Sequence, residues 1–313
     1  MFRTLLLNLV RAVGVLLVVS FATYCLMFSD GIGIARAVLG PTATDTQVAA
    51  RAAELGLTRP LYEQYFSWLA GAVRGDLGSS FLTGQPVTDA MANRAPVTLS
   101  LIILTIILTA VISVILGVTA ALYGGWVDKL VQFIAVLGAA VPGFIIAIAL
   151  IFAFAISIPL YPATGYIRIT DDPQGWLWSL TLPVTALLIG TIANAASQFR
   201  GSVSDALSQD YVRTLRSRGI SERAIVFRHV LRNAAGPGLI VLSLTTLGLL
   251  GGALFIESVF ALPGVGQLAN LSAQAGDVPM VMGTVIFAMI LILVVNFLAD
   301  LFVGILNPKS RIK

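Results

Sequence analysis

The stretch that decides the fold class is residues 97–123, VTLSLIILTIILTAVISVILGVTAALY, which is nearly free of ionisable side chains. It is long enough to cross a bilayer, because a spanning helix needs about 20 mainly apolar residues. The whole chain of 313 residues is 58% hydrophobic and only 11% charged, whereas soluble domains carry about 25% charged residues. So little charge could not cover a water-exposed surface, and the sequence predicts an integral membrane protein.

The sequence predicts six spanning helices. Backbone groups inside a bilayer must be hydrogen-bonded within the protein, which a helix achieves. The expected spans are residues 9–28, 97–123, 130–158, 180–199, 237–256 and 280–306. Pro142 and Gly143 lie near the middle of the third span. A proline removes a backbone hydrogen bond there, which predicts a kink that is either functional or static and filled by packing.

The charges between the spans predict the orientation. Residues 200–232 contain seven arginines, whereas residues 257–279 contain no lysine or arginine. Short positive loops stay in the cytoplasm, so we expect residues 200–232 and both termini to be cytoplasmic. The basic residues cluster at the ends of apolar runs, which explains them as orientation signals and argues against a nucleic-acid partner.

Residues 29–96 are expected to form a small helical segment on the outer side. Asp45 is the expected cap of a short helix that stops at Gly56, and Thr58 and Pro60 are expected to start a second. The second helix carries an apolar stripe that packs on the membrane domain or lies at the interface. The stripe consists of Leu61, Tyr65, Trp68, Leu69 and Ala72.

No motif for catalysis or metal binding is apparent in the sequence. Cys25 is the single cysteine and His229 the single histidine, which excludes cysteine-rich zinc clusters and His-rich metal sites. There is no Gly-x-x-x-x-Gly-Lys-Ser/Thr loop, so a P-loop ATPase is excluded. We expect a chain that is not an enzyme and that holds no cofactor.

The spans contain few polar side chains, and these are candidates for a translocation path. Asn194, Ser197 and Gln198 lie late in the fourth span, and Asn296 and Asp300 lie in the sixth. Hydrogen bonding between helices is the alternative role for each. Charged groups inside spans usually mark ion coupling, and their scarcity favours transport that is driven by another subunit.

The basic loop predicts two helices that meet at a glycine. Gly219 is a natural C-terminal stop for a helix over residues 209–218, and Ser221 can begin a second that runs to about Arg232. Leu207, Tyr211 and Leu215 are phased on one face. We expect a rigid elbow that docks in a groove of a partner.

These residues resemble the EAA loop of ABC importer permeases, in particular the first membrane subunit of the dipeptide/oligopeptide subfamily. Residues 210–219 read DYVRTLRSRG, and residues 227–233 read FRHVLRN. Arg213, Thr214 and Leu215 stand where the general motif has Glu-Ala-Ala. Further stretches resemble the same subfamily at 55–60, 64–65, 75–80, 260–268, 296–301 and 307–309.

The resemblance implies a type I ABC importer permease fold: an all-α membrane protein with six transmembrane helices and a helical extracytoplasmic insertion after the first. It divides the chain into residues 1–28, the tail and first span; 29–96, the insertion; 97–306, the permease core with the coupling loop at 200–233; and 307–313, a cytoplasmic tail. It places the protein in the bacterial cytoplasmic membrane.

The resemblance also implies partners and roles. The partners are a second permease subunit, cytoplasmic ATPases that bind ATP and magnesium, a substrate-binding protein outside, membrane lipid and a peptide substrate. The residues expected to couple to the ATPase are Asp210, Tyr211, Arg213, Thr214, Leu215, Arg216, Arg218 and Gly219. Pro263, Gly264 and Gly266 are the expected outer gate or binding-protein contact, and Asn194, Gln198 and Asn296 the path.

Two alternatives stay open at this point. The same architecture carries nickel, glutathione or another small solute in the same subfamily. A stand-alone ion-coupled carrier or channel differs in class, because it would transport without ATP or partner subunits.

Overall fold

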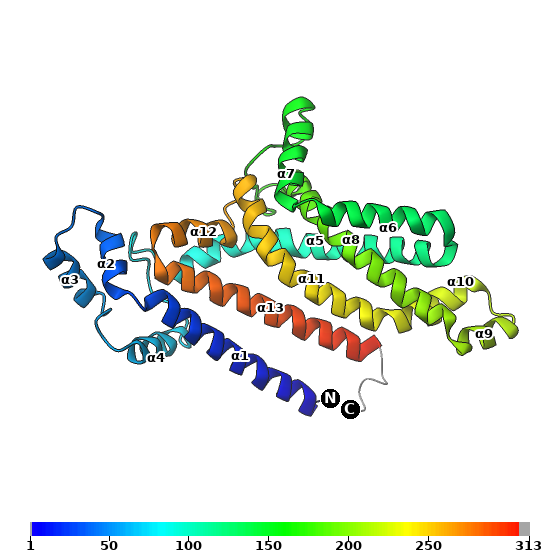
Figure 1. Cartoon of the computed structure of the whole chain (residues 1–313), viewed down its shortest axis with the longest axis horizontal. Coiled ribbons are helices and arrows are strands. Elements are labelled where there is room, and N and C mark those ends of the chain that lie inside the picture. Colours follow the sequence, from blue (N-terminus) through cyan, green and yellow to red (C-terminus); the bar gives the residue numbers. More distant parts are fainter. Residues whose placement is uncertain (1, 307–313) are drawn as a thin grey trace. The chain divides into compact units, whose positions relative to one another are not determined.

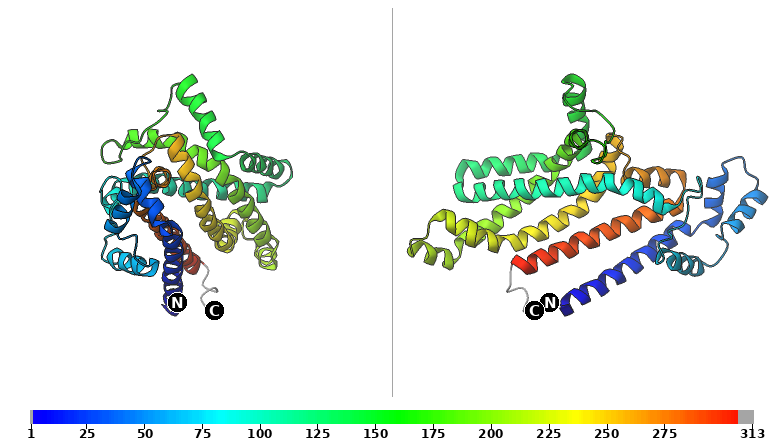
Figure 2. Two further views of the ribbon diagram at one scale, coloured as in Figure 1. Left: turned by 60° about the vertical axis from the view of Figure 1, so that its left-hand side comes forward. Right: turned by 180° about the vertical axis from the view of Figure 1, so that it is seen from behind.

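The computed structural model describes residues 2–306, and every element in that range is helical (Figures 1 and 2). The predicted tail at 307–313 lies outside the described residues. The elements are α1 (Phe2–Phe28), α2 (Gly31–Leu39), α3 (Asp45–Glu54), α4 (Leu61–Ala72), α5 (Val87–Tyr123), α6 (Gly125–Ala140), α7 (Gly143–Ile151), the π-helical η1 (Phe152–Ser157), α8 (Pro173–Ser208), α9 (Asp210–Ser217), α10 (Glu222–Ile225), the π-helical η2 (Val226–Val230), α11 (Leu231–Val259), α12 (Val265–Ala275) and α13 (Val278–Leu306).

Five of the described helices are long and apolar enough to cross a membrane, and the bent pair of α6 with α7 and η1 makes a sixth if it is one span. This confirms the all-α membrane class. The helices run further than the apolar runs that predicted them. For example, α5 begins at Val87, ten residues before the expected span, and contains Pro96 within it.

The kink predicted at Pro142 in the third span is a sharp break between two helices. The two halves, Gly125–Gly138 and Gly143–Ser157, meet at an angle of 91°. Val141 has an extended backbone, and Pro142 caps the start of α7. A residue before proline is pushed out of the helical region, and proline has no N–H to donate. The chain therefore breaks at this point instead of bending gently.

The chain divides into two compact units, which are described separately: residues 2–98 with 263–293, and residues 99–262 with 294–306. In the first unit, α4 packs against α1. The stripe on α4 meets aromatic side chains of α1, with ring centroids 5.6 Å apart for Tyr24 and Tyr65. The Tyr65 hydroxyl also lies 2.9 Å from Ser20 Oγ. Of the two predicted roles of the stripe, packing on the first span is the one observed.

The expected cap of α3 needs a correction by one residue. Thr44, not Asp45, is the N-cap, and its side chain accepts from the Gln47 N–H while the Gln47 side chain accepts from the Thr44 N–H. This reciprocal pair satisfies two free donors at the helix start. Asp45 instead pairs with Arg36, 2.7 Å away.

In the second unit, α8 is the central helix and packs against α6, α7 and α11. Two glycines allow close approach to it. A Cβ on Gly117 of α5 would lie 2.8 Å from the Arg200 backbone nitrogen, and one on Gly138 of α6 would lie 2.7 Å from the Ile189 carbonyl oxygen. Small residues let membrane helices pack backbone to backbone, so these positions fix the spacing of α5, α6 and α8.

Candidate functional site

The predicted elbow forms at the end of α8. The chain leaves α8 at Ser208, becomes extended at Gln209 and turns into the short helix α9. After the corner, the Ser221 side chain accepts from the Ala224 N–H and starts α10, which continues through η2 into α11. Figure 1 shows α9 and α10 together at one end of this unit. The expected stop at Gly219 and start at Ser221 are confirmed.

Gly219 makes the corner because its backbone is left-handed, with φ of 76°. The Gly219 N–H donates to the Arg216 carbonyl at 3.0 Å, and the Ile220 N–H donates to the Leu215 carbonyl at 3.2 Å. These are the two hydrogen bonds of the Schellman motif, which ends a helix most easily with glycine. Glycine alone adopts this conformation without a steric penalty.

A small apolar core packs the elbow against the neighbouring helix ends. Its buried members are Val203, Ala206, Val212, Ile225, Val230 and Ala234. The phased residues Leu207, Tyr211 and Leu215 are partly buried against it. The Tyr211 hydroxyl also accepts from Asn233 Nδ2 at 2.9 Å. The elbow is therefore packed onto the ends of the spans and not suspended from them.

An ion pair between two exposed side chains bridges the corner. Arg216 donates to Glu222 through two bonds, Nε to Oε1 at 2.5 Å and Nη2 to Oε2 at 3.1 Å. This geometry is the bidentate fork of arginine with a carboxylate. The hydrogen bond from Arg216 lowers the pKa of Glu222 below its ordinary value of 4.5. Arg216, an expected ATPase contact, thus also binds within the elbow.

The solvent-exposed face of the elbow carries arginines and one large aromatic side chain. Arg213, Arg218 and Arg223 are exposed, and Phe227 is 65% exposed. Phe227 lines a shallow hollow with Ser221, Arg223 and Ala224. An exposed aromatic ring beside arginines is a common composition for a protein interface. Phe227 was not predicted as a site residue, because the sequence does not show which of the four apolar residues between Arg223 and Arg228 is exposed.

A second ion pair lies at the same end of this unit. Arg200 Nη2 is 2.5 Å from Asp128 Oδ2, and the two side chains are 35% and 15% exposed. The pair joins the end of α8 to the start of α6. From the sequence, Arg200 was expected only to help orient the chain in the membrane. Nothing in the sequence indicates that Asp128 pairs with it.

The expected path residues are exposed in this chain. Asn194, Ser197 and Gln198 share one face of α8, with spacings of three and four residues, and Asn296 is exposed on α13. Among the described residues no hydrogen bond joins these side chains to one another. The side chain of Asp300 lies outside the described part of the chain. Polar groups on the outside of spanning helices need a partner or water.

The segment expected to form the outer gate or binding-protein contact lies beside α5 and is hydrogen-bonded to it. Pro263 is exposed and Gly264 is buried. Gly264 caps the start of α12, near Gly266. The Val265 N–H donates to Thr98 Oγ1 at 2.8 Å, so the irregular backbone here is hydrogen-bonded within its unit.

A buried hydrogen-bonded contact in the first unit was not predicted from the sequence. The buried Asp277 carboxylate accepts from Ser80 Oγ at 2.5 Å and from the Phe81 N–H at 3.1 Å. This contact links the insertion to the start of α13. Ser80 belongs to the stretch 75–80 that resembles the peptide permease subfamily, and nothing in the sequence indicates that Asp277 is its partner.

Two family models match the chain over most of its length. The model described as "Binding-protein-dependent transport system inner membrane component" matches residues 113–312, and the one described as "Binding-prot-dependent transport system membrane comp, N-term" matches residues 1–102. The first includes the elbow. The second includes α1 and the insertion.

Curated relatives agree. A Brucella abortus (strain 2308) protein named as a peptide transport system permease is 37% identical over 312 residues, 99% of each chain. A Sinorhizobium fredii (strain NBRC 101917 / NGR234) protein named as a peptide ABC transporter permease is 35% identical over 308 residues, 98% of each chain. The glutathione transport system permease protein GsiC of Escherichia coli (strain K12) is 33% identical over 280 residues, 89% of each chain.

Members of this family are membrane permease subunits and are not themselves catalytic. The apolar helices make this chain a multi-pass inner membrane protein. The chain belongs to the binding-protein-dependent transport system inner membrane component family, the permease subunits of ABC importers, and within it to the peptide permeases.

Proposed function

We propose that this permease subunit moves di- or oligopeptides into the bacterial cytoplasm, driven by a partner ATPase that docks on the elbow. Both termini and the elbow are then cytoplasmic. ATP and magnesium are held by the partner, and this chain itself contributes neither catalysis nor a cofactor site. A second permease subunit completes the path, and an outer binding protein delivers the peptide.

The observation that carries the proposal is the construction of the elbow. It is closed by the Arg216–Glu222 pair, stopped by Gly219 and seated on a core shared with α5, α8 and α11. A unit that is stiff in itself and packed on the spans passes a displacement on to them. A loose loop would absorb the same displacement. This supports mechanical coupling between the ATPase and the membrane helices.

Docking on the elbow is proposed to work through Phe227 and the residues that resemble the EAA loop. Aromatic side chains that fill a partner pocket contribute strongly to interfaces, and Phe227 is exposed on the elbow. ATP binding changes the shape of the ATPase and so favours one arrangement of the elbows. A partner shifts an equilibrium only by binding one state better than the other.

The proposed path follows the exposed polar face of α8, with Asn194 and Gln198, and includes Asn296 of α13. These groups are neutral, so they suit the amide groups of a peptide main chain. Pro263, Gly264 and Gly266 are proposed as the outer gate or the contact for the binding protein. A tryptophan at Gly264 should then impair transport or docking.

The names of relatives favour a peptide cargo. The two most similar of the three relatives described above are named for peptide transport, and the third for glutathione. Glutathione, itself a small peptide, is therefore the second candidate cargo.

Uptake by proteoliposomes tests the function. With the second permease, the ATPases and the binding protein present, we expect uptake of labelled peptides that requires ATP and that unlabelled glutathione does not compete out. Competition by glutathione at low concentration would favour the second candidate. Uptake by the chain alone without ATP would contradict the proposal and favour an ion-coupled carrier.

A variant at the corner tests coupling. In Gly219→Val the β-branched side chain meets a left-handed backbone, so the corner should deform. We expect ATP hydrolysis to continue without peptide uptake, and membrane insertion to be unchanged. Gly40→Val is the control, because Gly40 is also left-handed, with φ of 88° and open space at its Cβ, but lies far from the elbow in sequence. Normal coupled uptake by Gly219→Val would count against the coupling role.

A further inference from the structure

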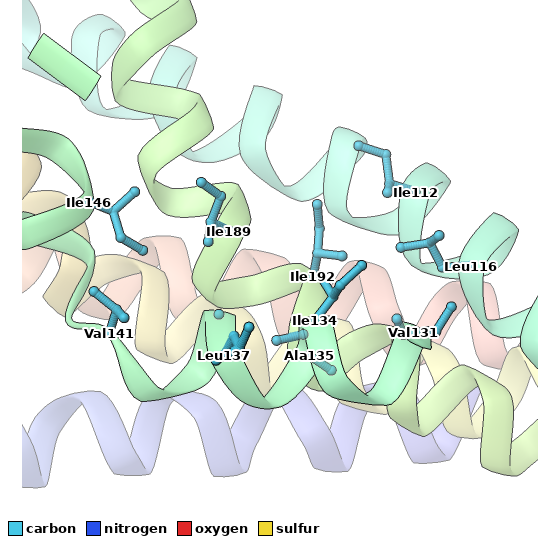
Figure 3. Close-up of a pocket in the computed structure, with 13 residues that line it drawn as sticks. Ile112, Leu116, Val131, Ile134, Ala135, Leu137, Val141, Ile146, Ile189 and Ile192 are labelled. Atoms are coloured by element: carbon cyan, nitrogen blue, oxygen red, sulfur yellow. The ribbon is translucent and has the colours of Figure 1, made fainter. Parts of the chain in front are cut away.

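The second unit contains an apolar cavity that the proposed transport mechanism does not use. It has a volume of about 450 Å³ and lies among α5, α6, α7 and α8. Every residue that lines it is Ile, Leu, Val, Ala or Gly. Figure 3 shows Ile134 of α6, Ile192 of α8 and Ile112 of α5 around this space. A cavity with this lining has no group that could hydrogen-bond the amides of a peptide, which excludes the cargo as its occupant.

The length of the cavity matches one leaflet of a bilayer. Along α6 and the turn after it, the lining runs from Val131 to Val141. At 1.5 Å per residue this is about 15 Å, and half of the hydrocarbon core of a bilayer is also about 15 Å. The cavity is therefore long enough for an acyl chain.

Charged side chains lie at one end of the cavity. Arg200 stands four residues after the lining residue Ala196, and Asp128 stands three residues before Val131. Residues with these spacings share a helix face, so the Arg200–Asp128 pair lies at this end. Asp128 binds Nη2 of Arg200, and the Arg200 side chain is still 35% exposed. The other donors of the guanidinium could therefore bind a phosphate or ester oxygen.

The turn between α5 and α6 lies at the same end and has the composition of a membrane interface. Tyr123 and Trp126 are 76% and 74% exposed, and aromatic side chains of this kind collect at the level of the lipid headgroups. Lys129 is exposed, and no described residue forms an ion pair with it. Lys129 adds a positive charge at the level of this end, on the face of α6 that also carries Phe133.

We infer that the cavity is a binding site for an anionic phospholipid of the leaflet that Arg200 faces. One acyl chain lies in the cavity between α5, α6 and α8. The phosphate binds near Lys129 and Arg200. The inference does not depend on the cargo or on the coupling role of the elbow.

Photocrosslinking in the assembled importer tests the site. The importer is reconstituted in nanodiscs with phosphatidylglycerol that carries a diazirine on one acyl chain, and the labelled residues are mapped by mass spectrometry. We expect label on residues that line the cavity and are partly buried, such as Leu116, Val131 and Ile192. Unlabelled phosphatidylglycerol should displace it, and phosphatidylcholine should not.

Two substitutions sharpen the test. In Ala193→Phe the ring occupies the cavity, because Ala193 is buried in its lining, and the label should be lost. The matched control is Ala149→Phe, which places the same ring on the exposed face of α7 and should keep the label. Lys129→Gln should keep the label but abolish the preference for phosphatidylglycerol over phosphatidylcholine.

Three results would overturn the inference. The first is label spread over outer residues such as Phe133 and Val136, without competition, which indicates bulk lipid only. The second is equal displacement by both phospholipids in the native chain. The third is label on the single chain that disappears in the assembled importer, which indicates that a partner subunit fills the cavity. The competition in the native chain decides the matter even if Ala193→Phe fails to assemble.

Discussion

The Arg216 guanidinium spans the Gly219 corner and holds the Glu222 carboxylate with two hydrogen bonds, 2.5 Å and 3.1 Å long. It joins the last turn of α9 to the first turn of α10. Together with the left-handed Gly219, it sets the angle between the two short helices.

The Arg216–Glu222 pair should stiffen the corner at neutral pH and lose this effect only in acid. The pKa of Glu222 is lowered by Arg216, so the pair contributes above the ordinary glutamate pKa and is lost as pH falls through the lowered value. We expect Glu222→Gln to speed amide hydrogen exchange at Gly219 and Ile220 at neutral pH. Because both side chains are exposed, the effect should stay local.

Hydrogen exchange followed by mass spectrometry measures this, with Glu54→Gln as the control. Glu54 pairs with Arg51 on α3 at 2.8 Å, so that variant removes a similar exposed pair from another helix. Exchange at the corner that is equal in the native chain and in Glu222→Gln would contradict the prediction.

Phe227→Ala should weaken ATPase docking with little loss of stability. The ring is 65% exposed, so its removal should change the free energy of unfolding by at most about 0.5 kcal/mol. Loss of an aromatic anchor from an interface commonly costs about 2 kcal/mol or more in binding. Binding of the ATPase to the permease in detergent, together with a melting curve, separates the two effects.

Phe66→Ala is the matched control for Phe227→Ala, since Phe66 is 61% exposed on α4, in the insertion. It should bind the ATPase normally. If both variants bind as tightly as the native chain, Phe227 is not part of the docking surface.

Gly117→Ala should destabilise the contact between α5 and α8. The added Cβ would lie 2.7 Å from the Phe199 Cβ and 2.8 Å from the Arg200 backbone nitrogen, so the helices must separate. Overpacking of this kind costs about 1–3 kcal/mol. The melting temperature in detergent should fall. Gly190→Ala, where nothing lies within 4 Å of the new atom, should melt like the native chain.

Asp277→Asn should loosen the loop around Ser80. The native carboxylate accepts two hydrogen bonds in a buried position, and an amide offers one acceptor oxygen in place of two. A buried donor left without its partner costs about 1–3 kcal/mol. Limited proteolysis should therefore cut residues 79–86 faster in the variant.

The control for this variant is Asp76→Asn. The Asp76 carboxylate accepts from the nearby Gly78 N–H at 2.8 Å in an exposed turn, so water can replace the lost bond. Equal cleavage rates in both variants would mean that the contact of Asp277 with Ser80 does not hold the loop.

Local signals in the sequence predicted the elbow well. Gly219 and Ser221 act through their own backbone and side chain, so their roles follow from residue type and position. Tyr211 and Leu215 also followed from helical spacing. Phe227 was not predicted, because it follows the buried Val226 directly and the sequence does not show which of the two faces solvent.

Features that depend on distant partners could not be predicted. Pro142 predicted a kink in the third span, but the size of the bend depends on the helices that α6 and α7 pack against. Asp128 and Arg200 are 72 residues apart, and Ser80 and Asp277 are 197 residues apart. No alternation or spacing connects such residues in a single sequence. The roles of Asn194, Gln198 and Asn296 stay predictions.

The elbow has a consequence for the biosynthesis of the protein. Its contacts are local: Leu215 with Ile220, Arg216 with Glu222, and Tyr211 with Asn233. The other residues of its core precede position 235 in the chain. Local contacts close quickly, because little chain entropy is lost in forming them. The elbow can therefore be complete while α13 is still on the ribosome, and a nascent permease could recruit its ATPase before its last span enters the membrane.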